Sequence, residues 1–167
     1  TPALGEFDYI IAHGVYSWVA PEVREALLSV CSANLAPQGV AYVSYNTYPG
    51  MHMLQALREM MLYHARHETD SHQRAARARE VVGFLAEAVA DERNRAYGTF
   101  IESYQELLER QVHEGRPQTD SVILHDELAE WNDPVYFYAF ATHGANHGLQ
   151  FLIEADVPMS MPQNLSP

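Results

Sequence analysis

Residues Phe7 to Gly50 contain the feature that most constrains the fold, two short apolar runs separated by a helical pattern. Phe7 to Ala12 reads FDYIIA, and Val40 to Tyr45 is rich in β-branched and aromatic residues, so both runs are typical of strands buried on both faces. Between them, Pro21 suits a first helical position, and apolar residues then recur at helical spacing as far as Asn34. The stretch therefore predicts two parallel strands joined by a helix in a right-handed βαβ unit.

The segment Leu35 to Gly39, LAPQG, is predicted to be a turn that ends the helix before the second strand begins. A two-stranded parallel sheet is not stable by itself, because both of its faces and both of its edges need cover. We therefore expect further strands, either missing from this chain or supplied by another one.

The chain after Gly50 changes from strand patterns to helical patterns. Met51 to His67 reads as an amphipathic helix, and Asp70 or Ser71 is expected to cap a second helix. A third helix is expected from about Arg95 to Val112.

The remaining part of the chain combines turns with one more helix. The polar link from His113 to Asp120 contains glycine and proline. Asp133 before Pro134 predicts a helix that runs to about His147, where Gly148 stops it. Residues 149–153 read as a strand.

These patterns predict an α/β fold in three parts. Residues 1–50 form a partial βαβ unit, residues 51–157 form a mainly α-helical domain, and residues 158–167 form an irregular tail.

Charge, cysteine content and the lengths of the apolar runs limit the partners and the location that we expect for the protein. The formal charge is −12, from 22 acidic against 10 basic residues, so nucleic acid and anionic membrane surfaces are repelled on average. Cys31 is the single cysteine and falls on the apolar side of a predicted helix, which favours a buried free thiol. No apolar run reaches the roughly 18 residues that span a bilayer, and the N-terminal residues lack a targeting pattern. We expect a cytoplasmic protein.

The candidate functional residues follow the two predicted strands, because ligands of open parallel sheets bind at the carboxyl ends of the strands. The residues concerned are His13, Gly14, Tyr16 and Trp18 after the first strand, and Tyr45 and Asn46 at the end of the second. A glycine lets backbone approach a ligand closely, and aromatic rings exclude water or hold a cation over their faces. The alternative is that these rings only cover the end of the sheet, and the residue types leave both readings open.

Three groups of side chains have spacings that suggest metal binding at first sight. They are His64 with His67, His143 with His147, and the run His125-Asp126-Glu127. The chain has no cysteine pair and no HExxH motif, so we predict no metal site and interpret these histidines as capping or partly buried polar residues. Asp126 and Glu127 are interpreted as an exposed carboxylate pair in a first helical turn, without a role in acid–base catalysis.

The order FDYIIAHGVYSWV, helix, LAPQGVAYVSYNTYPG resembles the fourth strand, the following helix and the fifth strand of a class I S-adenosylmethionine-dependent methyltransferase. HGVYSWV and SYNTYPG are more similar to bacterial methyltransferases, including protein-lysine methyltransferases, in which a methyltransferase regulatory domain follows the catalytic fold. The runs MMLYHARH, VVGFLAEAV and HDELAEWNDPVYFYAFATHGANHGLQFLIEA resemble that second domain. The similarity covers roughly residues 5 to 157.

The resemblance implies a Rossmann-like catalytic fold and a role for each strand end. It places His13 and Gly14 near the methionine end of the cofactor, and Tyr16, Trp18, Tyr45 and Asn46 toward the methyl acceptor. The reaction is an in-line attack on the sulfonium methyl, so the protein mainly aligns the reactants and removes water. The imidazole of His13 would orient or deprotonate an amine, and the aromatic rings would hold a cation.

The sequence departs from this family at the cofactor loop. Class I enzymes bind S-adenosylmethionine chiefly through a glycine-rich loop after their first strand, and only TPALGE precedes Phe7. We therefore expect a fragment that by itself binds the cofactor weakly or not at all and is inactive.

Two functions remain from the sequence. The first is part of a methyltransferase that acts on an amine of a protein, with a helical regulatory or substrate-positioning domain. The alternative is a noncatalytic interaction or dimerisation module, with homo-oligomers forming through the incomplete sheet. A stand-alone small-molecule enzyme has no recognisable motif here.

Overall fold

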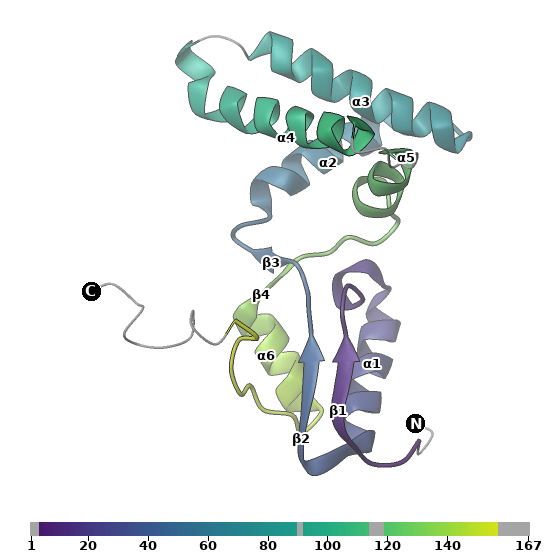
Figure 1. Ribbon diagram of the computed structural model, residues 1–167, viewed down its shortest axis with the longest axis vertical. Helices are drawn as coiled ribbons and strands as arrows, with labels where there is room; N and C mark the ends of the chain where they lie inside the picture. Colours follow the sequence, from purple (N-terminus) through teal and green to yellow (C-terminus); the bar gives the residue numbers. More distant parts are fainter. Residues whose placement is uncertain (1–3, 90–91, 114–118, 157–167) are drawn as a thin grey trace. The chain divides into compact units, whose positions relative to one another are not determined.

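The computed structural model describes residues 4–89, 92–113 and 119–156 (Figure 1). The chain divides into two compact units, one made of residues 1–50 together with 133–167, and the other of residues 51–132. We call them the strand unit and the helical unit. The predicted boundary at Gly50 coincides with the division between the units, whereas the chain returns to the strand unit at Asp133.

The strand unit contains the expected parallel pair. Strand β1 (Phe7–Ala12) pairs with β2 (Leu35–Val43), and helix α1 (Pro21–Asn34) connects them and runs alongside them in Figure 1. Helix α1 begins at the predicted proline, and it buries Leu28 and Cys31, which is a free cysteine. The β-α-β order of the prediction is confirmed.

The prediction that both strands are buried on both faces is wrong, because only Ala12 of β1 is buried and no residue of β2 is. Tyr9 is 75% exposed and Ile11 is 73% exposed, whereas Ala12 on the alternate side is buried. Alternation with period two sends Tyr9 and Ile11 to the same face of the sheet. Among the described residues, nothing covers that face enough to bury them, so one side of β1 is apolar and open.

The segment Leu35 to Gly39 is part of β2, so the prediction of a separate turn is wrong. The pairing is irregular there, because Phe7 pairs with Leu35 whereas Tyr9 pairs with Val40. A Cβ on Gly39 would lie 2.8 Å from the carbonyl oxygen of Phe7. The glycine is required because the irregular segment of β2 passes too close to β1 for a side chain.

The chain re-enters the strand unit through a short second sheet. Strand β3 (Thr47–Tyr48) pairs in parallel with β4 (Val135–Tyr136), and helix α6 (Phe137–Asn146) follows. The predicted helix start at Asp133 is wrong, because residues 135–136 are extended. Gly148 adopts a φ of 74° and stops the helix as predicted. The strand expected at residues 149–153 is not formed.

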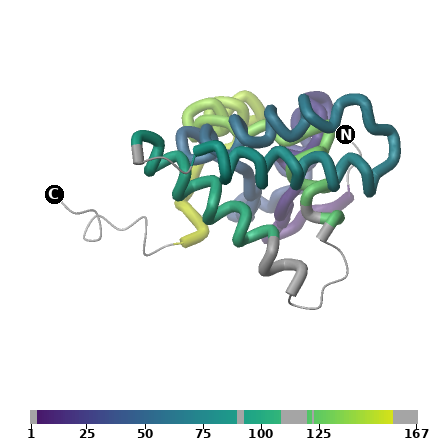
Figure 2. Tube along the Cα trace, turned by 90° about the horizontal axis from the view of Figure 1, so that it is seen from above, coloured from purple at the N-terminus to yellow at the C-terminus, as the bar shows by residue number. Residues whose placement is uncertain are grey.

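The helical unit contains three long helices. They are α2 (His52–Ala65), α3 (Ser71–Ala88) and α4 (Arg95–His113), followed by the short α5 (Thr119–Val122) and a π-helical turn, η3 (Ile123–Glu127). Figure 2 shows α3 and α4 side by side. One core joins these elements, with the buried residues Leu57, Met61, Ala65, Ala75, Ala78, Val82, Ile101, Tyr104, Leu108, Ile123 and Leu128.

Local signals located these helices correctly. Asp70 caps α3 as expected, with its carboxylate accepting a hydrogen bond from the backbone N–H of Gln73 at 3.0 Å. The predicted irregular tail 158–167 and most of the polar link between His113 and Asp120 lie outside the described residues. No helix in the described part of the chain is both long and apolar enough to cross a membrane.

The prediction that Asp126 and Glu127 form an exposed carboxylate pair is wrong, because both residues are half-buried. The carboxylate of Glu127 accepts a hydrogen bond at 2.6 Å from the hydroxyl of Tyr104, which belongs to the core of the helical unit. Burial raises the pKa of Glu127 above its ordinary value, although the Tyr104 hydrogen bond opposes that shift. Burial also raises the pKa of the Tyr104 hydroxyl, which is therefore neutral and donates to the carboxylate.

Candidate functional site

The carboxyl end of β1 places His13 and Gly14 against the end of β2. The N–H of Gly14 donates to Ser44 Oγ at 2.8 Å, and Nδ1 of His13 lies 3.1 Å from the same oxygen. The His13 ring stacks on Tyr42 with 6.0 Å between ring centroids. β2 therefore holds the exposed imidazole of His13 in place through two side chains.

Gly14 has the backbone freedom and the space that a ligand-binding loop requires. Its φ is 66°, which residues with a side chain rarely adopt. A Cβ built on it would meet nothing within 4 Å, so open space lies beside the backbone. The backbone at Gly14 is therefore exposed and open to close approach by another group.

An aromatic cluster joins Tyr16 and Tyr45 to Phe140 of α6. Tyr45 stacks on Phe140 with 4.1 Å between centroids, and Tyr16 meets Phe140 edge to face at 5.1 Å. Tyr16 also contacts Tyr45 at 5.9 Å. The structure therefore brings together two of the predicted site residues, and the third ring comes from more than 90 residues further along the chain.

The hydroxyl of Tyr16 is engaged inside the fold. Tyr16 is 3% exposed, and its oxygen lies 2.8 Å from Nδ1 of His143. Burial raises the pKa of Tyr16, against the opposing effect of the nearby Arg24, and burial also raises the pKa of Tyr45. Both phenols are neutral at physiological pH, so they can serve as walls and hydrogen-bond partners but not as bases.

Asn46 contributes its backbone to the joint between the strand ends and the returning chain. Its N–H donates to Ser17 Oγ at 2.8 Å, and its carbonyl accepts from the N–H of Val135 at 3.0 Å. The carbonyl of Ser17 in turn accepts from the N–H of Asp133 at 2.9 Å. Ser17 is fully buried at this junction, a role that no local sequence pattern indicates.

Trp18 has a buried indole N–H that makes no hydrogen bond within the described residues. An unpaired buried donor costs about 1–3 kcal/mol, so such a group calls for a partner. A bound acceptor group or a water molecule would satisfy it.

Arg24 ties the start of the returning chain to Tyr16. Its Nη2 donates to the carboxylate of Asp133 at 2.9 Å, and its Nε donates to the carbonyl of Val19 at 3.1 Å. The guanidinium carbon also lies 5.4 Å from the centroid of the Tyr16 ring. This contact explains why Asp133 does not cap a helix, since its carboxylate pairs with a buried cation.

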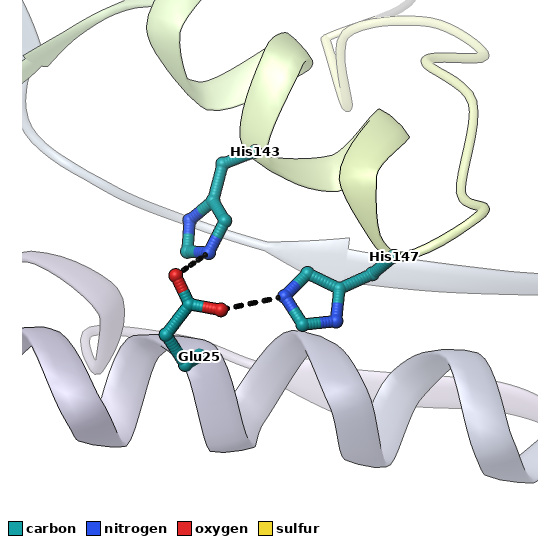
Figure 3. Close-up of side chains that lie close together, drawn as sticks. All are labelled: Glu25, His143 and His147. Carbon is teal, nitrogen blue, oxygen red and sulfur yellow. Dashed lines mark hydrogen bonds and ion pairs between the residues drawn. The ribbon is translucent and has the colours of Figure 1, made fainter.

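Glu25 faces two histidines of α6 and its cap (Figure 3). One carboxylate oxygen lies 2.9 Å from Nε2 of His143, and the other lies 3.0 Å from Nε2 of His147. The four-residue spacing of the histidines was visible in the sequence, and their predicted partly buried character is confirmed. Glu25 gave no signal, because only the packing of α1 against α6 brings it to them.

Comparison with known proteins defines the class to which this fold is similar. Residues 119–167 match the family described as predicted methyltransferase regulatory domain. The fold is similar to the structure of PKMT2 from Rickettsia typhi, with a TM-score of 0.74 and 32% identity, over 98% of this chain and 29% of that one. The structure of PKMT2 in complex with AdoHcy gives a TM-score of 0.67 and 33% identity, over 88% of this chain and 26% of that one.

Two uncharacterized proteins of Rickettsia prowazekii are similar in sequence. One is 36% identical over 99% of this chain and 28% of its own length, and the other is 35% identical over 81% of this chain and 51% of its own length. The chain thus spans about a quarter to a half of these relatives. The resemblance to bacterial S-adenosylmethionine-dependent methyltransferases that carry a regulatory domain is confirmed.

Proposed function

We propose that this chain is part of a longer S-adenosylmethionine-dependent methyltransferase that acts on an amine of a protein. The observation that carries the proposal is the similarity to PKMT2 along 98% of the chain at 32% identity. The name of that protein reads as a protein lysine methyltransferase, and one of its structures contains AdoHcy, the product that the cofactor leaves after methyl transfer. The proposal places residues 1–50 in the distal part of a Rossmann-like catalytic fold and residues 51–157 in the regulatory domain, of which the part from Asp133 onward lies in the strand unit.

The cofactor would lie with its methionine end at His13 and Gly14. In support, Gly14 combines a positive φ with open space, and His13 is exposed and held by Tyr42 and Ser44. S-adenosylmethionine supplies an electrophilic methyl group on a sulfonium. The chain contributes position, a proton acceptor in His13, and apolar walls that exclude water.

The acceptor would approach the side that carries Tyr16, Trp18, Tyr45 and Asn46. Tyr45 is a neutral, half-buried aromatic ring, which suits an ammonium group or a sulfonium over its face, whereas Tyr16 is buried and supports Tyr45 from inside the fold. The unpaired indole N–H of Trp18 offers one hydrogen-bond donor to a carbonyl group of the protein that accepts the methyl group. Tyr16 and Asn46 are also bound within the fold, so we assign them the role of fixing the wall rather than of moving a proton.

Two measurements test the proposal. Isothermal titration of the 167-residue chain with S-adenosylmethionine should show no micromolar binding, because the glycine-rich loop is absent from it. Micromolar binding of S-adenosylmethionine would contradict the proposal that this chain lacks the main cofactor-binding part of the enzyme. In the longer protein that carries this chain, a labelled methyl group should pass to lysine side chains of a protein, detected by mass spectrometry.

His13→Gln in that longer protein tests the proton acceptor. Loss of a general base lowers the turnover rate by roughly 100-fold or more. His67→Gln changes an exposed histidine of the helical unit, is the matched control, and should leave the turnover rate unchanged. Equal turnover rates for the two variants would exclude His13 from proton transfer.

A noncatalytic interaction module is the second candidate, and the open apolar face of β1 favours it. Phe7, Tyr9 and Ile11 are 43%, 75% and 73% exposed, and exposed apolar patches of this kind mark contact surfaces. Under this proposal the chain forms homo-oligomers through the incomplete sheet. Size-exclusion chromatography with light scattering should then show a dimer, and a strict monomer at high concentration would contradict it. A cytoplasmic location, with neither nucleic acid nor membrane as a partner, remains a prediction.

A further inference from the structure

We propose that Glu25, His143 and His147 form a binding site for a divalent transition-metal ion, with zinc as the best-fitting ion. The two imidazole Nε2 atoms and a carboxylate oxygen lie within 4.8 Å of one another (Figure 3). Two histidines and one carboxylate are a known donor set for zinc with an open fourth position. The proposal departs from the sequence-based prediction of no metal site, because Glu25 enters only through the packing of α1 on α6.

The distances in the cluster are close to those that a metal requires. Ligand atoms about 2.1 Å from a tetrahedral ion are about 3.4 Å from one another. Nε2 of His143 lies 2.9 Å from one Glu25 oxygen and Nε2 of His147 lies 3.0 Å from the other, so each pair needs to separate by about 0.5 Å to admit the ion. Glu25 is exposed and long enough to make that adjustment through its side chain.

His143 is already arranged as a metal ligand. Its Nε2 is buried and makes no hydrogen bond among the described residues, and its near neighbour is the Glu25 oxygen at 2.9 Å. Its Nδ1 lies 2.8 Å from the hydroxyl of Tyr16. Metal-binding histidines commonly donate their second ring N–H to an oxygen, which fixes the tautomer and the ring. Tyr16 supplies that oxygen.

The charges around the cluster also favour a cation. Glu25 brings one negative charge, and the nearby Arg24 is paired with Asp133 rather than with Glu25. The formal charge of the whole chain is −12, which attracts cations. The ion would clip α1 to α6 across more than 100 residues of sequence, so it would stabilise the strand unit and keep Phe140 near Tyr16. This role is independent of methyl transfer.

Zinc binding by the purified chain tests the site. The chain is prepared without a histidine tag, stripped with a chelator and titrated with zinc chloride by calorimetry. One ion should bind per chain, and the midpoint of thermal unfolding should rise on saturation. Magnesium at the same concentration should not compete, because imidazole prefers the softer ion.

Variants separate this site from other histidines. Glu25→Gln and His147→Ala should each weaken zinc binding by at least about tenfold, and Tyr16→Phe by roughly tenfold through the loss of its contact with His143. His67→Ala should leave the affinity unchanged. Glu25→Gln changes an exposed side chain by one atom type, so it reports on the site even where His147→Ala disturbs the fold. Absence of saturable binding, or equal affinity in Glu25→Gln and the parent chain, would overturn the proposal.

Discussion

Arg24→Met should destabilise the strand unit much more than the loss of a surface ion pair would. Arg24 is 9% exposed and makes three polar contacts, to the carboxylate of Asp133, to the carbonyl of Val19 and to the ring of Tyr16. Methionine keeps most of the apolar stem but removes the guanidinium. The substitution leaves the carbonyl of Val19 and the carboxylate of Asp133 without their Arg24 partner, and this loss lowers the free energy of unfolding.

The size of the effect follows from these contacts. A hydrogen bond from a charged donor contributes about 1.5 kcal/mol, and the contact with the aromatic ring contributes about 0.5–1 kcal/mol. The pair with Asp133 is discounted to under about 1 kcal/mol, because that carboxylate is 48% exposed. The expected total is about 3 kcal/mol. Asp133→Asn removes only the last contribution and should cost under about 1 kcal/mol.

The two tryptophans allow each unit to be followed separately. Trp18 lies in the strand unit and Trp131 in the helical unit, so a Trp131→Phe background leaves fluorescence that reports on the strand unit. Urea titration in that background should show a midpoint lower by roughly 1–2 M for Arg24→Met. The double variant with Asp133→Asn measures the coupling energy between the two side chains. Equal costs for the two single variants would refute the assignment of Arg24 to three contacts.

Further predictions concern the helical unit. Leu57→Ala should lower its free energy of unfolding by about 2–5 kcal/mol, because Leu57 is fully buried, and a loss below about 1 kcal/mol in urea titration would contradict the packing. Glu127 has a raised pKa, so its contribution to stability is present below pH 4.5 and is lost as the pH rises through its folded pKa. Glu127→Gln should therefore stabilise the unit more at pH 7 than at pH 4. A gain in stability that is the same at both pH values would argue against a buried charge at Glu127. The hydrogen bond between His72 and Asp120 raises the pKa of His72 and lowers the pKa of Asp120. The pair therefore contributes fully to the stability of the unit between about pH 3.8 and 6.5, and contributes less at lower and at higher pH. His72→Ala should reduce thermal stability most near pH 5, and a loss that is as large at pH 9 would exclude this pair as the cause.

The helices could be predicted from sequence because their signals are local. Pro21 at the start of α1, the Asp70 cap of α3 and the positive φ of Gly148 after α6 each act within one turn of the chain. The buried stripes of the helical unit followed from the period of apolar residues in the same way. These start, stop and periodicity signals act in the same way whatever other elements pack against the helices.

Asp133 and residues 149–153 show where local reasoning failed. Asp133 before Pro134 is a good helix start by itself, but pairing with Arg24 and the ladder of β4 with β3 hold that segment extended. The apolar run at residues 149–153 finds no strand to pair with in the described chain, and hydrogen-bonded partners are what make a strand. Both outcomes depend on residues far away in sequence.

The sequence by itself determined the β-α-β order, α1 and the three long helices of the helical unit, the two strand ends with their histidine and aromatic residues, and the resemblance to methyltransferases with a regulatory domain. Only the tertiary structure decided that the chain returns to the strand unit after residue 132, that Phe140 joins Tyr16 and Tyr45, and that Glu25 meets two histidines. The physical reason is that periodicity and caps are encoded within a few residues, whereas contacts across more than 100 residues depend on how whole elements pack.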